Sequence, residues 1–282
     1  MKPISPQLSP PAVLTFAASD PSGGAGIQAD LMTISSMGCH ALSVITALTV
    51  QDTIGIDSIL AIDADWVDDQ ARALLEDMPV DVFKIGLLGS VENIAVIAGI
   101  LSDYPDIPVV FDPVLASGRG DELADEDMIS AFRELLLPQT TVLTPNSLEA
   151  RRLAGETDAD DGEGDLSLAE CAQRMIIFGC EYVLLTGTHE NTPQVVNDLY
   201  NKDGLVRSDR WERLSGSYHG SGCTLASAVA AGLAHRLSVS DAVREAQDYT
   251  WRTLAAGFRP GMGQFIPDRF FWARRTEEGG ES

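Results

Sequence analysis

Short apolar segments alternate with helix-like segments along most of this sequence, and this alternation limits the possible folds more than any other feature. Strands with apolar residues on both faces need a covering on both sides of their sheet. Interleaved helices provide that covering in a mostly parallel α/β sheet. The predicted strands are residues 13–18, 41–48, 82–85, 109–111, 142–143 and 182–185, and the predicted helices are residues 26–37, 66–76, 91–101, 171–178, 224–234 and 242–254.

The turns that follow four of these strands carry the unusual sequences of the chain. They come after Ala18, Phe111, Leu143 and Leu185. In parallel α/β sheets, ligands bind at the carboxyl ends of the strands, and these ends lie at one edge of the sheet. The sequence therefore predicts a ligand site that draws residues from several separate turns.

Composition and charge indicate a globular protein that does not bind nucleic acid. Its 282 residues are 45% hydrophobic, and we found no internal repeat or linker, so we expect one domain at residues 13–272. The net charge of −23, from 42 acidic and 19 basic side chains, repels a phosphate backbone. Any site for a phosphate group must therefore be locally electropositive.

The ends of the chain and its cysteines predict a cytoplasmic protein. Residues 1–12 are proline-rich and lack an apolar segment of signal-peptide length, so we expect a flexible N-terminus. We expect residues 273–282 to be a disordered tail. The apolar stretches are too short to span a membrane. Four widely spaced cysteines without a CxxC pair suit reduced thiols.

An acidic stretch, residues 155–165, has the sequence GETDADDGEGD. It allows two interpretations, a calcium-binding loop and a solvated surface loop. The glycine is out of register for an EF-hand and the closing glutamate is absent. These departures favour the solvated loop.

The segment SDPSGGAGIQAD, residues 19–30, places three glycines between a predicted strand and a predicted helix. Glycines at this position allow a ligand to approach the backbone, and they expose amides at the start of a helix. The segment lacks the GK[ST] of a Walker A loop. It matches G-x-G-x-x-A, a dinucleotide-binding fingerprint, from Gly24 to Ala29. A turn that serves only packing is the remaining interpretation.

Polar side chains also follow three other predicted strands. Gln51 lies just past an apolar strand, where its amide suits a heteroaromatic edge or stabilises the loop. Asp112 begins DPV, and Asn146 and Glu149 lie one turn apart at a helix start. Asn146 and Glu149 fit a capping box, and with Asp112 they also fit the positioning of a hydrated Mg²⁺ ion.

The most informative segment is GSYHGSGCTLASAVAA, residues 216–231. Gly220, Ser221, Gly222 and Cys223 precede a helix of small residues, so several unpaired N–H groups and the positive end of the helix dipole converge there. That geometry stabilises the charge of a phosphoryl group in transfer. It also predicts a lowered pKa for Cys223. The alternative is an ordinary helix start with a buried structural cysteine.

Six motifs in order resemble the hydroxymethylpyrimidine/phosphomethylpyrimidine kinase family of thiamine biosynthesis, in the ribokinase superfamily. The resemblance runs from about Val13 to Phe265. It implies a Rossmann-like three-layer α/β/α sandwich of the ribokinase type, commonly dimeric. The motifs are SDPSGGAGIQAD, VITALTVQDT, KIGLLGS, DPV, TPNSLEA and HGSGCTLASA.

The resemblance implies ATP- and Mg²⁺-dependent phosphorylation of the hydroxymethyl group of 4-amino-5-hydroxymethyl-2-methylpyrimidine, and then of the resulting monophosphate. It implies a set of roles for individual residues. Cys223 takes the place of a catalytic aspartate, with Gly220, Ser221 and Gly222 as the anion hole. The pyrimidine is expected to contact Gln51, Asp30, Ala18, Ala25, Leu87 and Val114, whereas Asn146, Glu149 and Thr186 are expected to serve the nucleotide, and Asp112 and Glu149 the metal.

The chain departs from the family pattern at two cationic positions. Gly118 stands where a lysine is common, and the adjacent Arg119 is a candidate for the phosphate-facing cation. Thr186 stands where a strand-end lysine is common, which resembles the wider ribokinase pattern. The second phosphorylation depends on which cation meets the substrate phosphate.

Three other functions stay open from the sequence. A pyridoxal kinase also acts on a hydroxymethyl group of a heteroaromatic ring. An NAD-dependent oxidoreductase is consistent with the G-x-G-x-x-A match. The third is a pyrimidine-binding protein without catalytic activity.

Overall fold

The structure is a computed structural model that describes residues 9–117, 120–155 and 166–274. Its described part is built on one nine-stranded sheet with the order β3-β2-β1-β4-β5-β6-β7-β8-β9. The strands are β1 (Ala12–Ser19), β2 (His40–Gln51), β3 (Ile56–Ala61), β4 (Val82–Ile85), β5 (Val109–Phe111), β6 (Val142–Leu143), β7 (Tyr182–Thr186), β8 (Gln194–Asn201) and β9 (Gly204–Glu212).

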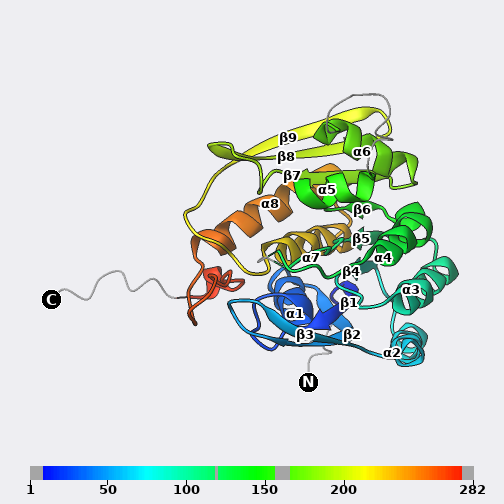
Figure 1. The fold of residues 1–282 in the computed structure, drawn as a ribbon. Helices are drawn as coiled ribbons and strands as arrows, with labels where there is room; N and C mark the ends of the chain where they lie inside the picture. Colours follow the sequence, from blue (N-terminus) through cyan, green and yellow to red (C-terminus); the bar gives the residue numbers. More distant parts are fainter. Residues whose placement is uncertain (1–8, 118–119, 156–165, 275–282) are drawn as a thin grey trace, which may run out of the picture.

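Helices cover both faces of this sheet (Figure 1). Most begin at a side chain that accepts a backbone N–H, such as Ser90 for α3, Ser167 for α6 and Ser238 for α8. They are α1 (Gly26–Ser36), α2 (Ala64–Asp77), α3 (Val91–Asp103), α4 (Glu126–Ala131), α5 (Ser147–Ala154), α6 (Leu168–Ile177), α7 (Ser221–Ala234) and α8 (Val239–Ala255), with a π-helical turn at Phe132–Leu136 and 3₁₀ turns at Leu137–Gln139 and Phe271–Ala273.

The prediction of a mostly parallel sheet is confirmed. The six strands from β2 to β7 in the sheet order pair in parallel, whereas β3, β8 and β9 pair in antiparallel fashion. These three outer strands were missed in the sequence. Exposed and partly buried residues alternate along β9, so it lacks the continuous apolar run by which the inner strands were recognised.

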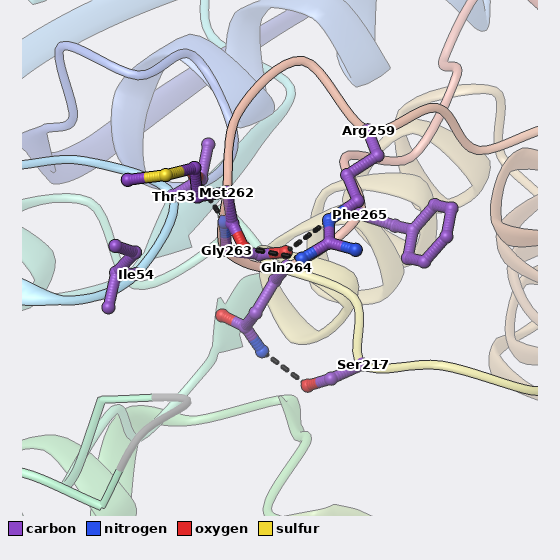
Figure 2. Close-up of a pocket in the computed structure, with 8 residues that line it drawn as sticks. All are labelled: Thr53, Ile54, Ser217, Arg259, Met262, Gly263, Gln264 and Phe265. Atoms are coloured by element: carbon purple, nitrogen blue, oxygen red, sulfur yellow. Dashed lines mark hydrogen bonds between the residues drawn. The ribbon is translucent and has the colours of Figure 1, made fainter.

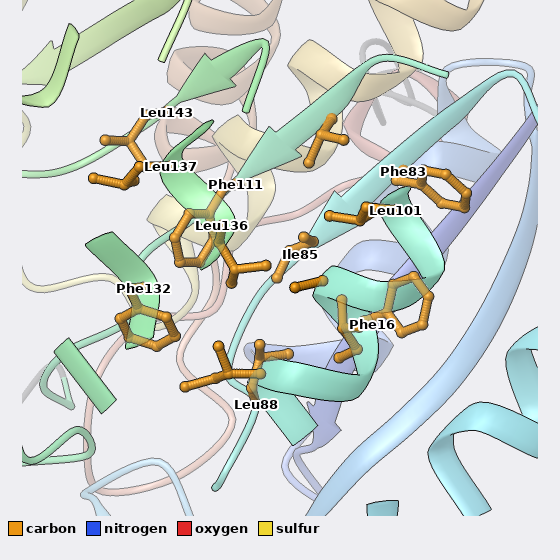
Figure 3. Packing of buried hydrophobic residues seen from close by; sticks show 14 of the residues in the cluster. Phe16, Phe83, Ile85, Leu88, Leu101, Phe111, Phe132, Leu136, Leu137 and Leu143 are labelled. Carbon is orange, nitrogen blue, oxygen red and sulfur yellow. The ribbon is translucent and has the colours of Figure 1, made fainter. Parts of the chain in front are cut away.

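Two apolar cores lie on opposite faces of the sheet. One packs Phe16, Phe83 and Phe111 against α2 to α6, and Figure 3 shows these rings among leucine side chains from the same layer. The other packs Val13 and Val82 against α1, α7 and α8. Because successive side chains of a strand point to opposite faces, each inner strand serves both cores.

The face toward α1 and α7 becomes polar near the carboxyl ends of β1 and β4. Thr15 and Lys84 are cross-strand partners, two residues beyond Val13 and Val82 on the same face. Both side chains are fully buried. A threonine and a charged lysine in a position that the pattern reserves for apolar residues need polar partners, and those partners lead to the site.

The ends of the chain and the acidic stretch give little further information. Residues 1–8, 275–282 and 156–165 lie outside the described part, so the predictions for the flexible ends and for the solvated loop stay predictions. The domain limits at residues 13–272 also stay a prediction. Among the helices that are described, none combines the length and apolar character needed to cross a membrane.

Candidate active site

The predicted site residues follow the carboxyl ends of neighbouring parallel strands. Gln51 ends β2, Asp112 follows β5, Asn146 follows β6 and Thr186 ends β7. The start of α7 reaches this edge as well, because a Cβ atom on Gly222 would lie 3.7 Å from Asp112 Oδ1. The fold therefore brings most of the predicted residues to one edge of the sheet.

Two glycine turns meet where α1 and α7 begin. Gly220 has φ +75°, and a Cβ atom there would lie 2.0 Å from the carbonyl oxygen of Gly24. Gly26 has φ +57°, and its Cβ would lie 2.4 Å from the carbonyl oxygen of Ala18. Any side chain at either position would force the turns apart, so glycine is required by the contact as well as by φ.

Arg269 holds this junction from behind and was not singled out in the sequence. Its side chain is buried, and its guanidinium donates to the carbonyl oxygens of Gly23 and Gly24 and to Thr224 Oγ1. Burial lowers the pKa of Arg269, against the raising effect of Cys223 and other groups. Arg269 lies over 230 residues along the sequence from the glycines that it contacts. This separation explains why no local motif indicated it.

The first turn of α7 has the geometry that was predicted for an anion site. Gly220 caps the helix in the left-handed conformation, and Thr224 N is the first amide to bond back, to Gly220 O at 2.9 Å. The amides of Ser221, Gly222 and Cys223 precede that bond and have no acceptor within the helix. With the helix dipole they make the end of α7 electropositive.

The predicted low pKa of Cys223 is wrong for the protein without ligand. Burial and then the Asp112 carboxylate raise the pKa of the thiol to about 12, against the lowering effect of Lys84 and of the Gly26 N–H. The thiol is therefore protonated at neutral pH, and it hydrogen-bonds to Asp112. Desolvation and a neighbouring negative charge outweigh the helix N-terminus here.

Asp30 and Lys84 form a fully buried ion pair beneath Cys223. Lys84 Nζ lies 2.9 Å from Asp30 Oδ2, and both side chains are 0% exposed. Thr15 donates to Asp30 Oδ2 at 2.7 Å, and Ser227 donates to Asp30 Oδ1 at 2.8 Å. Burial lowers the pKa of Lys84, but Asp30, Cys223 and Asp112 together raise it well above its ordinary value. The lysine is therefore charged.

This arrangement places Asp30 behind the site. Both of its carboxylate oxygens are bonded to protein groups, and its side chain faces Lys84. The expected contact with a pyrimidine is therefore not available to Asp30 in this structure. Its observed role is to hold a positive charge under Cys223 and Asp112.

Asp112 and Glu149 are two carboxyl groups that both have a raised pKa. Burial raises the pKa of Asp112, although Lys84 counteracts it. Burial and then Asp112 raise the pKa of Glu149 to about 8. Asp112 is 4% exposed, and its Oδ2 atom has no hydrogen-bond partner among the described residues. An unpaired buried carboxylate oxygen beside a second carboxyl group fits a site for a divalent cation.

These residues fit Mg²⁺ that is held through water and phosphate oxygens. Within the described residues, no group of three acidic, histidine or cysteine side chains stands close enough to enclose a metal ion. Mg²⁺ retains several waters and commonly binds through one or two carboxylates and substrate phosphates. Asp112 and Glu149 supply the two carboxylates.

The capping-box interpretation of Asn146 and Glu149 is confirmed. Asn146 Oδ1 accepts the N–H groups of Leu148 and Glu149 at 2.9 and 3.0 Å, and Glu149 Oε2 accepts the Asn146 N–H at 2.9 Å. The cap fixes the Glu149 side chain and leaves its role toward a metal ion open. Asn146 also forms a backbone bridge with Thr186, so two of the predicted nucleotide residues lie side by side.

Gln51 contacts a histidine that the sequence did not assign to it. Gln51 Nε2 lies 2.7 Å from His219 Nε2, and the same histidine nitrogen lies 2.8 Å from Asp20 Oδ2. His219 and Asp20 are separated from each other by 199 residues in sequence. Only the approach of the two glycine turns brings them together, so no pattern in the sequence could have indicated the contact.

The remaining predicted residues differ in exposure. Leu87, Val114 and Ala25 are partly exposed, as residues that touch a ligand must be, whereas the side chain of Ala18 is buried. Arg119 lies outside the described residues, so its expected role as the phosphate-facing cation stays a prediction.

Two surface cavities flank the β2–β3 hairpin, and neither contains the predicted catalytic residues. One, of about 450 Å³, is lined by Thr53 and by the loop from Arg259 to Phe265 (Figure 2). Its residues Thr53 and Ser217 are each two positions from Gln51 and His219. The other, of about 510 Å³, is lined by residues of β2, the end of β3 and α2, among them Leu48 and Trp66.

Comparisons with known proteins agree with this geometry. The hydroxymethylpyrimidine/phosphomethylpyrimidine kinase of Streptomyces coelicolor is 41% identical over 260 residues, which cover 92% of this chain and 94% of that protein. The ADP complex of Bacillus subtilis pyridoxal kinase superposes with a TM-score of 0.82 at 27% identity, covering 94% of this chain and 99% of the kinase.

A second solved structure, the phosphomethylpyrimidine kinase of Clostridium difficile, has a TM-score of 0.72 at 32% identity and covers 85% of this chain and 97% of its own. Both superpositions confirm the ribokinase-like three-layer fold. Residues 20–268 match the family described as phosphomethylpyrimidine kinase. The chain therefore belongs to the phosphomethylpyrimidine kinase family.

Proposed function

We propose that this protein transfers the γ-phosphoryl group of ATP to the hydroxymethyl group of 4-amino-5-hydroxymethyl-2-methylpyrimidine, and then phosphorylates the monophosphate, in thiamine biosynthesis. The observation that carries the proposal is the meeting of the α7 N-terminus with Asp112, whose buried Oδ2 atom has no protein partner among the described residues. The membership of the kinase family supports the same reaction.

The start of α7 supplies the electrostatic part of the reaction. The amides of Ser221, Gly222 and Cys223 point along the axis of a 14-residue helix whose first turn has no acidic side chain. Negative charge on the oxygens of the transferred phosphoryl group is stabilised at this position. The glycine contacts hold these amides in place before a ligand arrives, so little reorganisation is needed.

Asp112 and Glu149 would hold a Mg²⁺ ion through its waters, and the bound ion would neutralise charge on the ATP phosphates. Asn146 and Thr186 lie beside each other at this edge and would bind the nucleotide. The ADP complex is a property of the pyridoxal kinase relative, and its similarity supports ATP as the phosphate donor here.

Cys223 is proposed to hold the substrate hydroxyl group next to the anion site. With a pKa near 12 it is a neutral hydrogen-bonding group in the ligand-free protein. It acts as a base only if ligand binding lowers that pKa. Lys84 is the buried cation placed to stabilise negative charge on Cys223 or Asp112.

The substrate ring is proposed to lie between the two turns that follow β2 and β4. Gln51 provides the polar edge, and Leu87, Val114, Ala25 and the Ala18 backbone provide the surrounding surface. Each is near the carboxyl end of a neighbouring strand. Arg119 is proposed to contact the phosphate of the monophosphate substrate.

A homodimer and a cytoplasmic location also belong to the proposal. Leu48, Val50 and Leu60 are exposed apolar residues on the β2–β3 ladder, with exposed Trp66 nearby on α2. Such a surface supports association with a second copy, and light scattering after size exclusion measures the mass directly. The four cysteines are free thiols, which suits a reducing compartment.

Pyridoxal kinase activity is the second candidate, because the pyridoxal kinase of Bacillus subtilis has the higher TM-score of the two solved structures. Sequence identity favours the phosphomethylpyrimidine kinase relatives. Steady-state rates with the two alcohols separate the activities, and equal or faster turnover of pyridoxal would contradict the proposal.

Mass spectrometry of the product tests the main proposal. The protein is incubated with the aminopyrimidine alcohol and ATP-Mg, and two added phosphates are expected. One phosphate limits the activity to the first step, and none contradicts the proposal. A thermal-shift measurement tests the oxidoreductase alternative. If NADH raises the Tm and ATP-Mg does not, the result favours an oxidoreductase.

A further inference from the structure

Four polar side chains, those of Asp20, His219, Gln51 and Thr49, form a continuous chain of contacts. Asp20 Oδ2 lies 2.8 Å from His219 Nε2, and Gln51 Nε2 lies 2.7 Å from the same nitrogen. At the other end of the amide, Thr49 Oγ1 lies 3.1 Å from Gln51 Oε1 and 2.9 Å from the carbonyl oxygen of Ser19. The side chains of His219 and Asp20 are 12% and 3% exposed, so protein groups replace water around them.

Asp20 determines where the proton of His219 resides. Burial acts to raise the pKa of Asp20, but hydrogen bonds from His219, Ser22 and Ala25 together outweigh it and hold the pKa low. An ionised carboxylate only accepts hydrogen bonds. His219 Nε2 must therefore carry a hydrogen and donate it to Asp20.

A nitrogen that already carries a hydrogen cannot accept one from the Gln51 amide. With Nε2 of Gln51 facing His219, two donors would meet at 2.7 Å. The conflict disappears when the amide is turned by half a rotation, which exchanges oxygen and nitrogen at nearly the same positions. Gln51 Oε1 then shares the single His219 Nε2 hydrogen with Asp20 Oδ2 in a three-centre bond, and Gln51 Nε2 donates to Thr49.

Thr49 is consistent with only this arrangement. Its hydroxyl group has one hydrogen, and the carbonyl oxygen of Ser19, which only accepts, is the nearer partner at 2.9 Å. Thr49 Oγ1 is then free to accept from the amide. Along the series from Asp20 to the Ser19 carbonyl, only one assignment of donors and acceptors gives every donor an acceptor.

We propose that Asp20 and His219 are positioning residues that fix the orientation of the Gln51 amide and thereby the direction in which a heteroaromatic ligand binds. The inference rests on the proposed function of Gln51 as a ligand contact. The amide's outer edge then offers its oxygen on the His219 side and an N–H group on the Thr49 side.

A ring nitrogen next to an exocyclic amino group matches that edge in one direction. The amino group donates on the His219 side, and the ring nitrogen accepts on the Thr49 side. A freely rotating amide would accept the same pair in two opposite directions, whereas an amide of fixed orientation accepts it in one. A ring without an amino group beside its nitrogen would make one of the two bonds only.

Nuclear magnetic resonance of the ligand-free protein tests the proton position without any assumption about function. Long-range ¹H–¹⁵N spectra of ¹⁵N-histidine distinguish the two tautomers, and the signal that disappears in His219→Phe belongs to His219. We expect a hydrogen on Nε2. A neutral ring with its hydrogen on Nδ1 would overturn the proposal.

A double-mutant cycle tests whether His219 acts through Gln51. His219→Phe retains a ring against Gly24 but removes the N–H donor. We expect the affinity for the aminopyrimidine alcohol, measured by calorimetry, to fall on the order of tenfold, with ATP affinity unchanged. In a Gln51→Ala background, the same substitution should have no further effect.

A loss of equal size in both backgrounds would contradict the proposal, as would a loss of ATP affinity together with the pyrimidine. His235→Phe is the matched control, because His235 contacts Met37 and Cys39 away from this network. If the unmodified protein binds no aminopyrimidine, the proposed function fails, while the histidine spectrum still decides the orientation of Gln51.

Discussion

Two pairs of buried residues lie close together beneath and beside the start of α7, and they differ in how their charge is compensated. Asp30 is bonded to Lys84, Thr15 and Ser227, so its carboxylate is fully satisfied. Asp112 and Glu149 are less completely paired: Lys84 lowers the pKa of Asp112 only in part, and Asp112 Oδ2 has no hydrogen-bond partner among the described residues. Burial raises the pKa of both, and Asp112 raises the pKa of Glu149 further.

Helix α7 connects these two regions. Cys223 contacts Asp112, and Ser227, one turn further on the same side, contacts Asp30. An incompletely compensated buried carboxyl group is typical of a position where a ligand supplies the missing charge, which is the role proposed for Asp112. The pair without a ligand role has its counter-charge built in.

Breaking the Asp30–Lys84 ion pair should have the largest effect. Lys84→Met leaves Asp30 charged, buried and unpaired, so we expect the free energy of unfolding to fall by about 3–5 kcal/mol. Urea denaturation measures it. The exposed Lys202→Met is the control, and it should change little.

A double variant sharpens this test. Asp30→Asn in the Lys84→Met background removes the stranded charge and should restore part of the stability. If Lys84→Met alone is as stable as the unmodified protein, the pair is not the compensated element that the structure indicates.

Disrupting the other pair, Asp112 and Glu149, should affect activity and not stability. Asp112→Asn removes a carboxylate proposed to hold Mg²⁺, and we expect turnover or apparent Mg²⁺ affinity to fall about 10–100-fold. Because the carboxylate is unfavourable in the empty site, Tm should stay the same or rise. A stability loss comparable with that of Lys84→Met, with turnover intact, would reverse the comparison.

The reactivity of the Cys223 thiol depends on the charge of Asp112. Its pKa of about 12 predicts slow alkylation by iodoacetamide at pH 8 in the ligand-free protein. Asp112→Asn removes the repulsion and should accelerate the reaction by about tenfold, or one pKa unit. The Cys223→Ala variant gives the alkylation of the other three thiols alone, and this background is subtracted. An unmodified protein that reacts rapidly at pH 7 would contradict the raised pKa.

The pH dependence of stability should show the smallest effect. The folded-state pKa of Glu149 is about 8, against an ordinary value of 4.5, so the folded protein binds more protons between these values. Stability should therefore fall as pH rises from about 4.5 to 8 without divalent cations.

Glu149→Gln removes this titration and retains an acceptor for the Asn146 N–H, so the capping box survives. We expect the variant to exceed the unmodified protein by roughly 1–2 kcal/mol above pH 8 and to match it near pH 4.5. Parallel denaturation curves at both pH values measure the difference. An identical pH dependence in the two proteins would show that Glu149 is not perturbed.

The inner part of the fold could be predicted because its signals are local. Val82–Ile85, Val109–Phe111 and Val142–Leu143 were predicted with the bounds that the structure shows. The outer strands β8 and β9 could not be recognised, because their mixed polarity resembles that of surface loops. Strand pairing at the edge depends on partners and not on composition.

The candidate site was predicted in part for the same reason. The left-handed turn at Gly220, which is proposed to bind an anion, and the cap at Asn146 are properties of a few consecutive residues. The partners of Lys84, His219 and Arg269 could not be predicted, since each lies far away along the chain.

The sequence by itself determined the alternation of strands and helices, the glycine turns before α1 and α7, and the family. These follow from propensity, capping and motif order, which depend on neighbouring residues. The three-dimensional arrangement was needed to show that Asp30 pairs with Lys84 while Asp112 keeps an oxygen without a partner among the described residues, that the Cys223 pKa is raised, and that Asp20 and His219 meet Gln51. Burial and charge pairing arise from groups that approach in space, so no local pattern contains them.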